Sequence, residues 1–222
     1  MTSLLTTLRF ADTAFPSGSF GFSNGIEALV SHGKISDARR LTDYLILLLR
    51  HRWACADRVA LSQSHRGGLD LATVRAVDRV FEASCACEPV RSGSSRNGLA
   101  YLTSHARLET PGAREYRDMV LKSEAVGHLS VVQGMTLRAL GVEEITAIEM
   151  SLYTTAANMA QAAVRLGQIG ALDAQRSLGE ALANCSDCAR IPEPESEICS
   201  FVPYSEIVTV QQSRTNVRLF AN

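Results

Sequence analysis

The chain has 222 residues, 46% of them hydrophobic, and its 22 basic and 23 acidic residues leave a net charge of −1. This balance argues against a nucleic-acid-binding protein, because such proteins usually carry a basic excess, and the hydrophobic fraction excludes a wholly disordered chain. The first residues lack a secretory signal and no apolar run is long enough to span a membrane. Six cysteines are too few for a disulfide scaffold in a chain of this length, which is typical of a reducing compartment. We therefore expect a cytoplasmic protein with no membrane contact.

Helical periodicity dominates the sequence. Leu41, Leu45, Leu48 and Leu49 recur at helical spacing and predict a helix over about residues 37–54. Similar stripes predict helices over about residues 70–86, 90–108, 113–125, 129–141, 143–166 and 173–183. The last but one contains an alanine-rich stretch, Ala156 to Ala163, which either lies at the centre of the bundle or forms a dimer contact.

The C-terminal region differs in composition from the rest. From Cys185 onward it carries Pro192, Pro194 and Pro203, and residues Ile207 to Val210 have a β-like pattern. We therefore expect an all-α protein, with a single helical-bundle domain of about eight to ten helices over residues 1–184. Residues 185–222 are expected to form a flexible tail that docks on a partner.

Motifs for catalysis and nucleotide binding are absent. The sequence contains no P-loop, dinucleotide fingerprint, HExxH or GxSxG pattern, so it indicates no catalytic residue and no cofactor. Cys185 and Cys188 form a CxxC pair, with Cys199 beyond it. Tetrahedral zinc usually needs four ligands in two such pairs. We interpret these cysteines as free thiols and assign no metal ligand, with a zinc site as the alternative.

Two segments have features of contact sites. The loop from Phe15 to Glu27 places three phenylalanines among glycines and serines, either as an aromatic contact loop or as a turn tucked into the core. The chain ends with Arg218, Leu219 and Phe220, large residues that are unusual at a solvated terminus. They either fold back onto the chain's own core or become ordered on a partner.

Five segments follow one another in a characteristic order. They are ADTAFPSGSFGFSNGIEALV from Ala11, Arg91-x-x-Ser94-x-x-x-Gly98, HLSVVQGMTLRALGV from His128, LYTTAANMAQAAVRLGQIGALDAQ from Leu152, and PYSEIVTVQQSRTNVRLFAN from Pro203. Together they resemble the urease accessory protein UreF family over nearly the whole chain. Four positions depart from the family pattern: Ile26 replaces leucine, Leu99 arginine, Gln212 histidine and Asn222 serine.

The resemblance implies an all-helical, non-enzymatic scaffold that forms a homodimer. Such a protein binds UreD (also called UreH) and the GTPase UreG on urease apoprotein, where GTP hydrolysis drives nickel delivery. Phe20 and Arg218 match positions used to recruit UreG, and the tail from Pro203 would become ordered on UreD. The candidate partner-binding residues are Phe20, Ser23, Glu27, Arg91, Ser94, Arg165, Pro203, Arg218, Leu219 and Phe220.

Three alternatives remain at this stage. The chain could regulate UreG by activating its GTPase or gating its fidelity, since activating proteins often supply an arginine to the phosphates. It could instead carry nickel on Cys185, Cys188 and Cys199 or on its histidines. The remaining alternative is an all-α enzyme with an unrecognised site.

Overall fold

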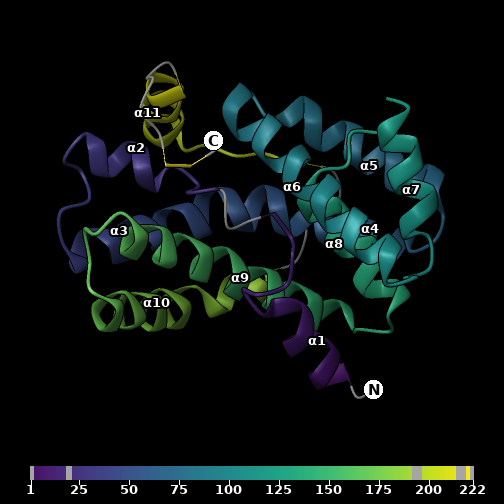
Figure 1. Ribbon diagram of the computed structural model, residues 1–222, viewed down its shortest axis with the longest axis horizontal. Coiled ribbons are helices and arrows are strands. Elements are labelled where there is room, and N and C mark those ends of the chain that lie inside the picture. Colours follow the sequence, from purple (N-terminus) through teal and green to yellow (C-terminus); the bar gives the residue numbers. More distant parts are fainter. Residues whose placement is uncertain (1–2, 19–21, 192–196, 214–218, 221–222) are drawn as a thin grey trace.

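The computed structural model describes residues 3–18, 22–191, 197–213 and 219–220, and within these ranges every regular element is a helix (Figure 1). The prediction of a single all-helical domain is confirmed. The elements in chain order are α1 (Ser3–Ala11), α2 (Ile26–Ser31), α3 (Ala38–Leu48), η2 (Leu49–Asp57), α4 (Arg58–Gly67), α5 (Leu71–Ser84), α6 (Glu88–Arg107), α7 (Ala113–Leu121), α8 (Leu129–Ala139), α9 (Glu144–Arg165), α10 (Ala171–Cys185), η3 (Ser186–Arg190) and α11 (Pro203–Ser213).

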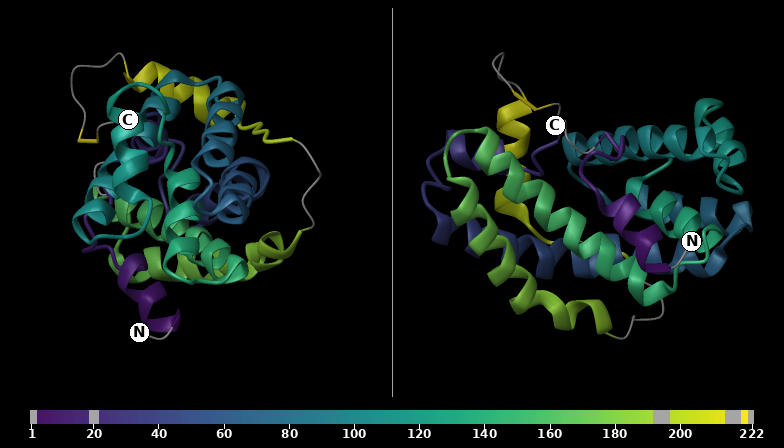
Figure 2. Two further views of the ribbon diagram at one scale, coloured as in Figure 1. Left: turned by 90° about the vertical axis from the view of Figure 1, so that its right-hand side faces the viewer. Right: turned by 60° about the horizontal axis from the view of Figure 1, so that its bottom comes forward.

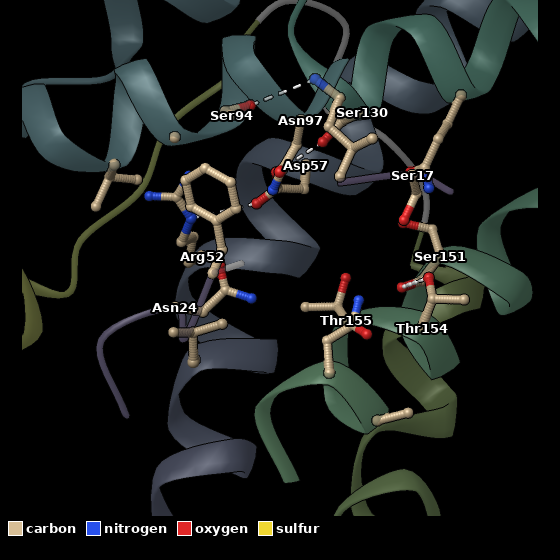
Figure 3. A pocket seen from close by; sticks show the side chains of 18 of the residues that line it. Ser17, Asn24, Arg52, Asp57, Ser94, Asn97, Ser130, Ser151, Thr154 and Thr155 are labelled. Atoms are coloured by element: carbon tan, nitrogen blue, oxygen red, sulfur yellow. Dashed lines mark hydrogen bonds and ion pairs between the residues drawn. The ribbon is translucent and has the colours of Figure 1, made fainter. Parts of the chain in front are cut away.

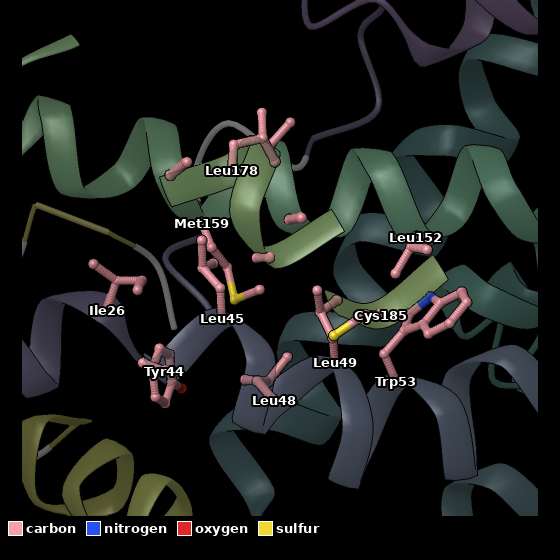
Figure 4. Close-up of a cluster of buried hydrophobic side chains, with 14 of the residues drawn as sticks. Ile26, Tyr44, Leu45, Leu48, Leu49, Trp53, Leu152, Met159, Leu178 and Cys185 are labelled. Atoms are coloured by element: carbon pink, nitrogen blue, oxygen red, sulfur yellow. The ribbon is translucent and has the colours of Figure 1, made fainter. Parts of the chain in front are cut away.

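One hydrophobic core forms where α3, α9 and α10 pack together (Figure 4). Leu41 and Leu45 of α3 are fully buried. In Figure 4, Leu45 lies beside Met159 of α9, with Leu178 of α10 next to them. The alanine-rich stretch of α9 is buried as well, with residues 156, 157, 160, 162 and 163 at most 3% exposed. Of its two interpretations, burial within the chain is therefore the one that the structure supports.

A second core forms between α4, α5, α6, α7 and α8. Its largest fully buried side chains include Phe81, Tyr101 and Tyr116. A Cβ atom at Gly134 of α8 would lie 2.2 Å from the carbonyl oxygen of Leu61 in α4. Glycine at this position therefore allows the two helix backbones to come into direct contact.

The helix predicted over residues 37–54 continues to Gly67, but through a π-helical stretch, η2. Trp53 of η2 is fully buried, and its indole N–H donates to Ser151 Oγ at 3.1 Å. Such π-helical turns alter which carbonyls are engaged within a helix. Here the carbonyls of His51 and Cys55 accept the main-chain N–H groups of Phe201 and Cys199, each at 3.2 Å.

The C-terminal region contains a helix, α11, that lies beside α2 and α6 on the side of the domain opposite α10 (Figures 1 and 2). The β-like prediction for Ile207 to Val210 was wrong, because these residues belong to α11. β-branched side chains favour strands locally, but here packing against α2 stabilises the helix. The described part of the tail, expected to be flexible, is thus packed on the domain. No helix in the described ranges combines the length and apolar character needed to span a bilayer.

Candidate functional site

A buried hydroxyl network attaches α11 to the domain. The hydroxyl of Tyr44 in α3 donates to the carbonyl of Asn24 at 2.9 Å. The same oxygen lies 2.7 Å from Ser205 Oγ of α11, so Ser205 is the donor of that bond. Burial raises the pKa of Tyr44 to about 12, and its hydroxyl therefore stays protonated at neutral pH. On α2, Ser31 Oγ donates to Gln212 Oε1 at 3.0 Å, which fixes the other end of α11.

The outward face of α11 is apolar, and so is Phe201, which lies two positions before the helix. Phe201, Tyr204 and Ile207 are 80%, 51% and 55% exposed. The inner face of the same helix buries Val208 and Thr209. The helix is therefore fixed on one side and offers large apolar side chains to solvent on the other.

The end of the chain folds back onto α2 and α9. The main-chain N–H groups of Leu219 and Phe220 donate to the two carboxylate oxygens of Glu27, at 2.6 and 3.3 Å. The Phe220 ring is 6% exposed, and the guanidinium of Arg165 lies 4.4 Å from its centroid. Leu219, by contrast, is 75% exposed. Of the two interpretations of the terminal residues, the fold-back onto the chain's own core is observed for Phe220.

The turn before α2 directs Glu27 toward this site. Ser23 is fully buried, and Asn24 and Gly25 follow it with φ values of 51° and 86°. A Cβ atom at Gly25 would lie 2.8 Å from the hydroxyl oxygen of Tyr44. The position therefore requires glycine both for its left-handed backbone and for its proximity to the hydroxyl network.

Arg91 and Ser94 occupy a different place, where α6 meets α5 and the start of α8. Arg91 Nε is 3.3 Å from Glu82 Oε1, and Ser94 Oγ accepts the main-chain N–H of Leu129 at 3.4 Å. A Cβ at Gly98, one turn further along, would lie 1.8 Å from the carbonyl oxygen of residue 127. This face of α6 thus attaches to the segment that begins α8.

Six of the candidate residues from the sequence fall into two groups. Glu27, Arg165, Leu219 and Phe220 come together at one site, and Arg91 and Ser94 lie on the attached face of α6. Pro203 is the first residue of α11, where its fixed φ favours helix initiation. Phe20 and Arg218 lie outside the described residues.

A polar pocket of about 130 Å³, which the sequence analysis missed, is lined in part by α11. Figure 3 shows the polar side chains that the other elements contribute to it. Its walls come from the N-terminal loop, η2, α6, α8, α9 and α11, and most of its polar groups are hydroxyls and amides. Ser94 and Ser205 both line it, so the pocket lies between the attached face of α6 and α11. Its polar residues are scattered along the chain, and no local pattern could have revealed it.

The charged centre of the pocket is an ion pair within η2. Arg52 Nε lies 3.4 Å from Asp57 Oδ2, and Ser130 Oγ donates to Asp57 Oδ1 at 2.7 Å. Burial lowers the pKa of Arg52, but Asp57, Cys85, Glu206 and Tyr44 together more than offset this, so the net shift is upward and Arg52 remains charged. Asn97, 7% exposed, also lines the pocket, and its Oδ1 has no hydrogen-bond partner within the described part of the chain.

The six cysteines are free thiols. Cys185, the last residue of α10, and Cys188 of η3 are buried, whereas Cys199 is exposed on the tail. Burial raises the pKa of Cys185 to about 11, so the uncoordinated group is a neutral thiol at neutral pH. Among the described residues, no three His, Cys, Asp or Glu side chains are grouped so that they could hold a metal ion.

These features describe an all-helical, single-domain protein in which a C-terminal helix lines a polar pocket and a buried carboxylate holds Leu219 and Phe220. The sequence model of the UreF family matches residues 35–182, about two thirds of the chain. The chain belongs to the UreF family of urease accessory proteins.

Similarity to curated relatives extends over the full length. The chain is 29% identical to the urease accessory protein UreF of Trichodesmium erythraeum, over 98% of this chain and 96% of the relative. It is 28% identical to the urease accessory protein UreF 1 of Brucella melitensis, over 99% and 92% of the two chains. It is 27% identical to the urease accessory protein UreF of Bacillus sp. strain TB-90, over 99% of both.

Proposed function

We propose that the chain is a non-catalytic scaffold that bridges UreD and the GTPase UreG on urease apoprotein while nickel is inserted. In this proposal it works in the cytoplasm as a homodimer, without a cofactor of its own, and residues 185–222 are its partner-docking segment. Its membership of the UreF family, and its full-length similarity to proteins named urease accessory protein UreF, support the proposal.

The observation that carries the proposal is the outward face of α11. Tyr204 and Ile207 expose 51% and 55% of their surface on one side of a helix whose other side is fixed, and Phe201, just before this helix, exposes 80%. Contiguous exposed apolar side chains of this kind typically mark interaction sites. A helix held in place offers such anchors to a partner groove at little entropic cost. We assign this face to UreD.

UreG is assigned to the positions of Phe20 and Arg218, which the family resemblance indicates and which lie outside the described residues. Arg218→Ala is expected to abolish UreG recruitment and to leave the fold intact. Unchanged UreG binding by this variant would contradict the assignment.

The proposal is tested by size-exclusion chromatography with light scattering on the chain co-expressed with UreD and UreG. Tyr204→Asp and Ile207→Asp place a charge on the docking face, and Leu172→Asp is the control, because Leu172 is 77% exposed on α10. We expect the wild type and the control to form a ternary complex and the two α11 variants to lose UreD. Wild-type chain that binds neither partner would overturn the scaffold proposal. Assembly of the α11 variants would overturn the assignment of this face to UreD.

A further inference from the structure

Glu27 is a buried carboxylate whose observed partners come from the other end of the chain. It is 6% exposed on α2, so it offers almost no surface to another protein. Burying a carboxylate is costly unless hydrogen bonds replace its water. The N–H groups of Leu219 and Phe220, at 2.6 and 3.3 Å, provide one bond to each oxygen, and bonds to an ionised acceptor are stronger than neutral ones.

Adjacent residues at this end differ sharply in exposure. Phe220 is 6% exposed, belongs to the same hydrophobic core as α3 and α9, and lies under the Arg165 guanidinium at 4.4 Å. A cation over an aromatic face adds electrostatic attraction to the burial of the ring. Leu219 remains 75% exposed. The site thus holds the main chain and one side chain and leaves the neighbouring side chain available.

We propose that Glu27 and Arg165 form an intramolecular receptor for the chain's own C-terminus, and that Glu27 is a positioning residue for UreG recruitment. Glu27 acts through the terminal segment and does not contact UreG itself. The receptor stands on the contacts above, and its role in recruitment rests on the proposed function. Leu219, which the receptor holds, directly follows Arg218 in the sequence, and Arg218 is the residue that the proposed function assigns to UreG.

The receptor is tested on the full-length chain by hydrogen exchange of the C-terminal peptide, read by mass spectrometry. Glu27→Gln keeps the shape of the side chain but removes its charge, and Phe220→Ala removes the ring. Both are expected to raise the exchange rate of the terminal amides. Glu27→Gln should raise it roughly tenfold, the difference between a charged and a neutral acceptor, and Phe220→Ala should raise it at least as much, because the burial of the ring is lost. The controls are Glu180→Gln, at an exposed position of α10, and Leu219→Ala. The terminal amides of both variants should exchange at the wild-type rate. Wild-type exchange in both Glu27→Gln and Phe220→Ala would overturn the receptor.

Recruitment is tested by measuring the affinity of UreG for each variant in its complex with UreD. We expect Glu27→Gln and Phe220→Ala to weaken UreG binding roughly tenfold while UreD binding is retained. Phe220→Tyr keeps the ring under Arg165 and should restore UreG binding. Restored binding would show that Phe220→Ala acts through loss of the ring and not through loss of the fold. Variants that loosen the terminus but bind UreG normally would overturn the positioning role and leave the scaffold proposal intact. Wild-type chain that binds neither partner would instead overturn the scaffold proposal, whatever the exchange data show.

Discussion

The hydroxyl of Tyr44 lies 2.7 Å from Ser205 Oγ, although the two residues are 161 positions apart in the chain. This contact joins α3, a helix of the central core, to α11, a wall of the polar pocket. The position of α11 therefore depends on a buried polar bond as well as on apolar packing.

Tyr44→Phe is expected to lower the free energy of unfolding by about 1–3 kcal/mol, because it leaves the carbonyl of Asn24 and the Ser205 hydroxyl without their partner. Urea denaturation measures the change. Tyr153→Phe is the matched control, since Tyr153 is 44% exposed on α9 and should change stability by less than about 0.5 kcal/mol. Equal effects of the two substitutions would show that the network contributes nothing.

Asp78 should be among the least replaceable residues of the second core. Its fully buried carboxylate accepts the Tyr116 hydroxyl and the main-chain N–H groups of residues 126–128 at 2.6–3.0 Å. Asp78→Asn brings an NH₂ group against these donors and should cost about 3 kcal/mol or more. Thermal unfolding of this variant beside exposed Asp43→Asn provides the comparison. A small effect at Asp78 would mean that the segment before α8 is held by other contacts.

Two glycines should respond to alanine in opposite directions. At Gly98 the added carbon would lie 1.8 Å from the carbonyl oxygen of Gly127, so Gly98→Ala should destabilise the domain by about 3 kcal/mol. At Gly179, in α10, nothing lies within 4 Å, and Gly179→Ala should stabilise it by about 0.5–1 kcal/mol through helix propensity. The melting temperatures should therefore move apart, and a shift in the same direction would contradict the packing described for α6.

His105 should make stability depend on pH. It is fully buried beside the rings of Phe10, Phe15 and Tyr101, and burial lowers its pKa from 6.5 to about 4, with a further contribution from the positive charge of Arg9. Above the unfolded pKa its contribution is complete. As the pH falls below that value the unfolded chain binds a proton that the folded chain does not, and stability is lost until the folded pKa is reached.

This effect is isolated by comparing the wild type with His105→Phe. Between about pH 7.5 and about pH 5, His105 should lower the free energy of unfolding of the wild type by about 2 kcal/mol. The variant should not show this part of the loss. Urea denaturation at both pH values gives the difference in the free energy of unfolding between the two proteins. The contributions of the carboxylates cancel in this difference, because both proteins contain them. Identical pH profiles would show that the pKa of His105 is the same in the folded and unfolded chains, which would contradict the effect of burial.

The helices could be predicted because their signal is local. The leucines of α3 and the alanines of α9 are spaced so that burial follows from helical geometry alone. The π-helical stretch could not be predicted in this way, since its carbonyls are engaged by the distant residues Cys199 and Phe201. Ile207 to Val210 misled the prediction for a related reason, because tertiary packing outweighed a local preference.

The site was less accessible to sequence reasoning. The resemblance indicated Glu27, Arg165, Leu219 and Phe220 individually, yet Glu27 and Leu219 are 192 positions apart and nothing local connects them. One signal was present: Glu27 lies in the otherwise apolar run Ile-Glu-Ala-Leu-Val, which is typical of a buried carboxylate. Its partners could not be identified, because they are main-chain N–H groups that every residue type except proline possesses.

Recognition of the main chain by Glu27 has an evolutionary consequence. A carboxylate that binds N–H groups does not read the side chains of the residues that carry them, so Leu219 can change without loss of either bond. Proline is the residue type that removes the donor, and it should be selected against at both 219 and 220. The exposed residues of the tail can therefore diverge with the partners of each lineage while the chain's end stays attached at the same place.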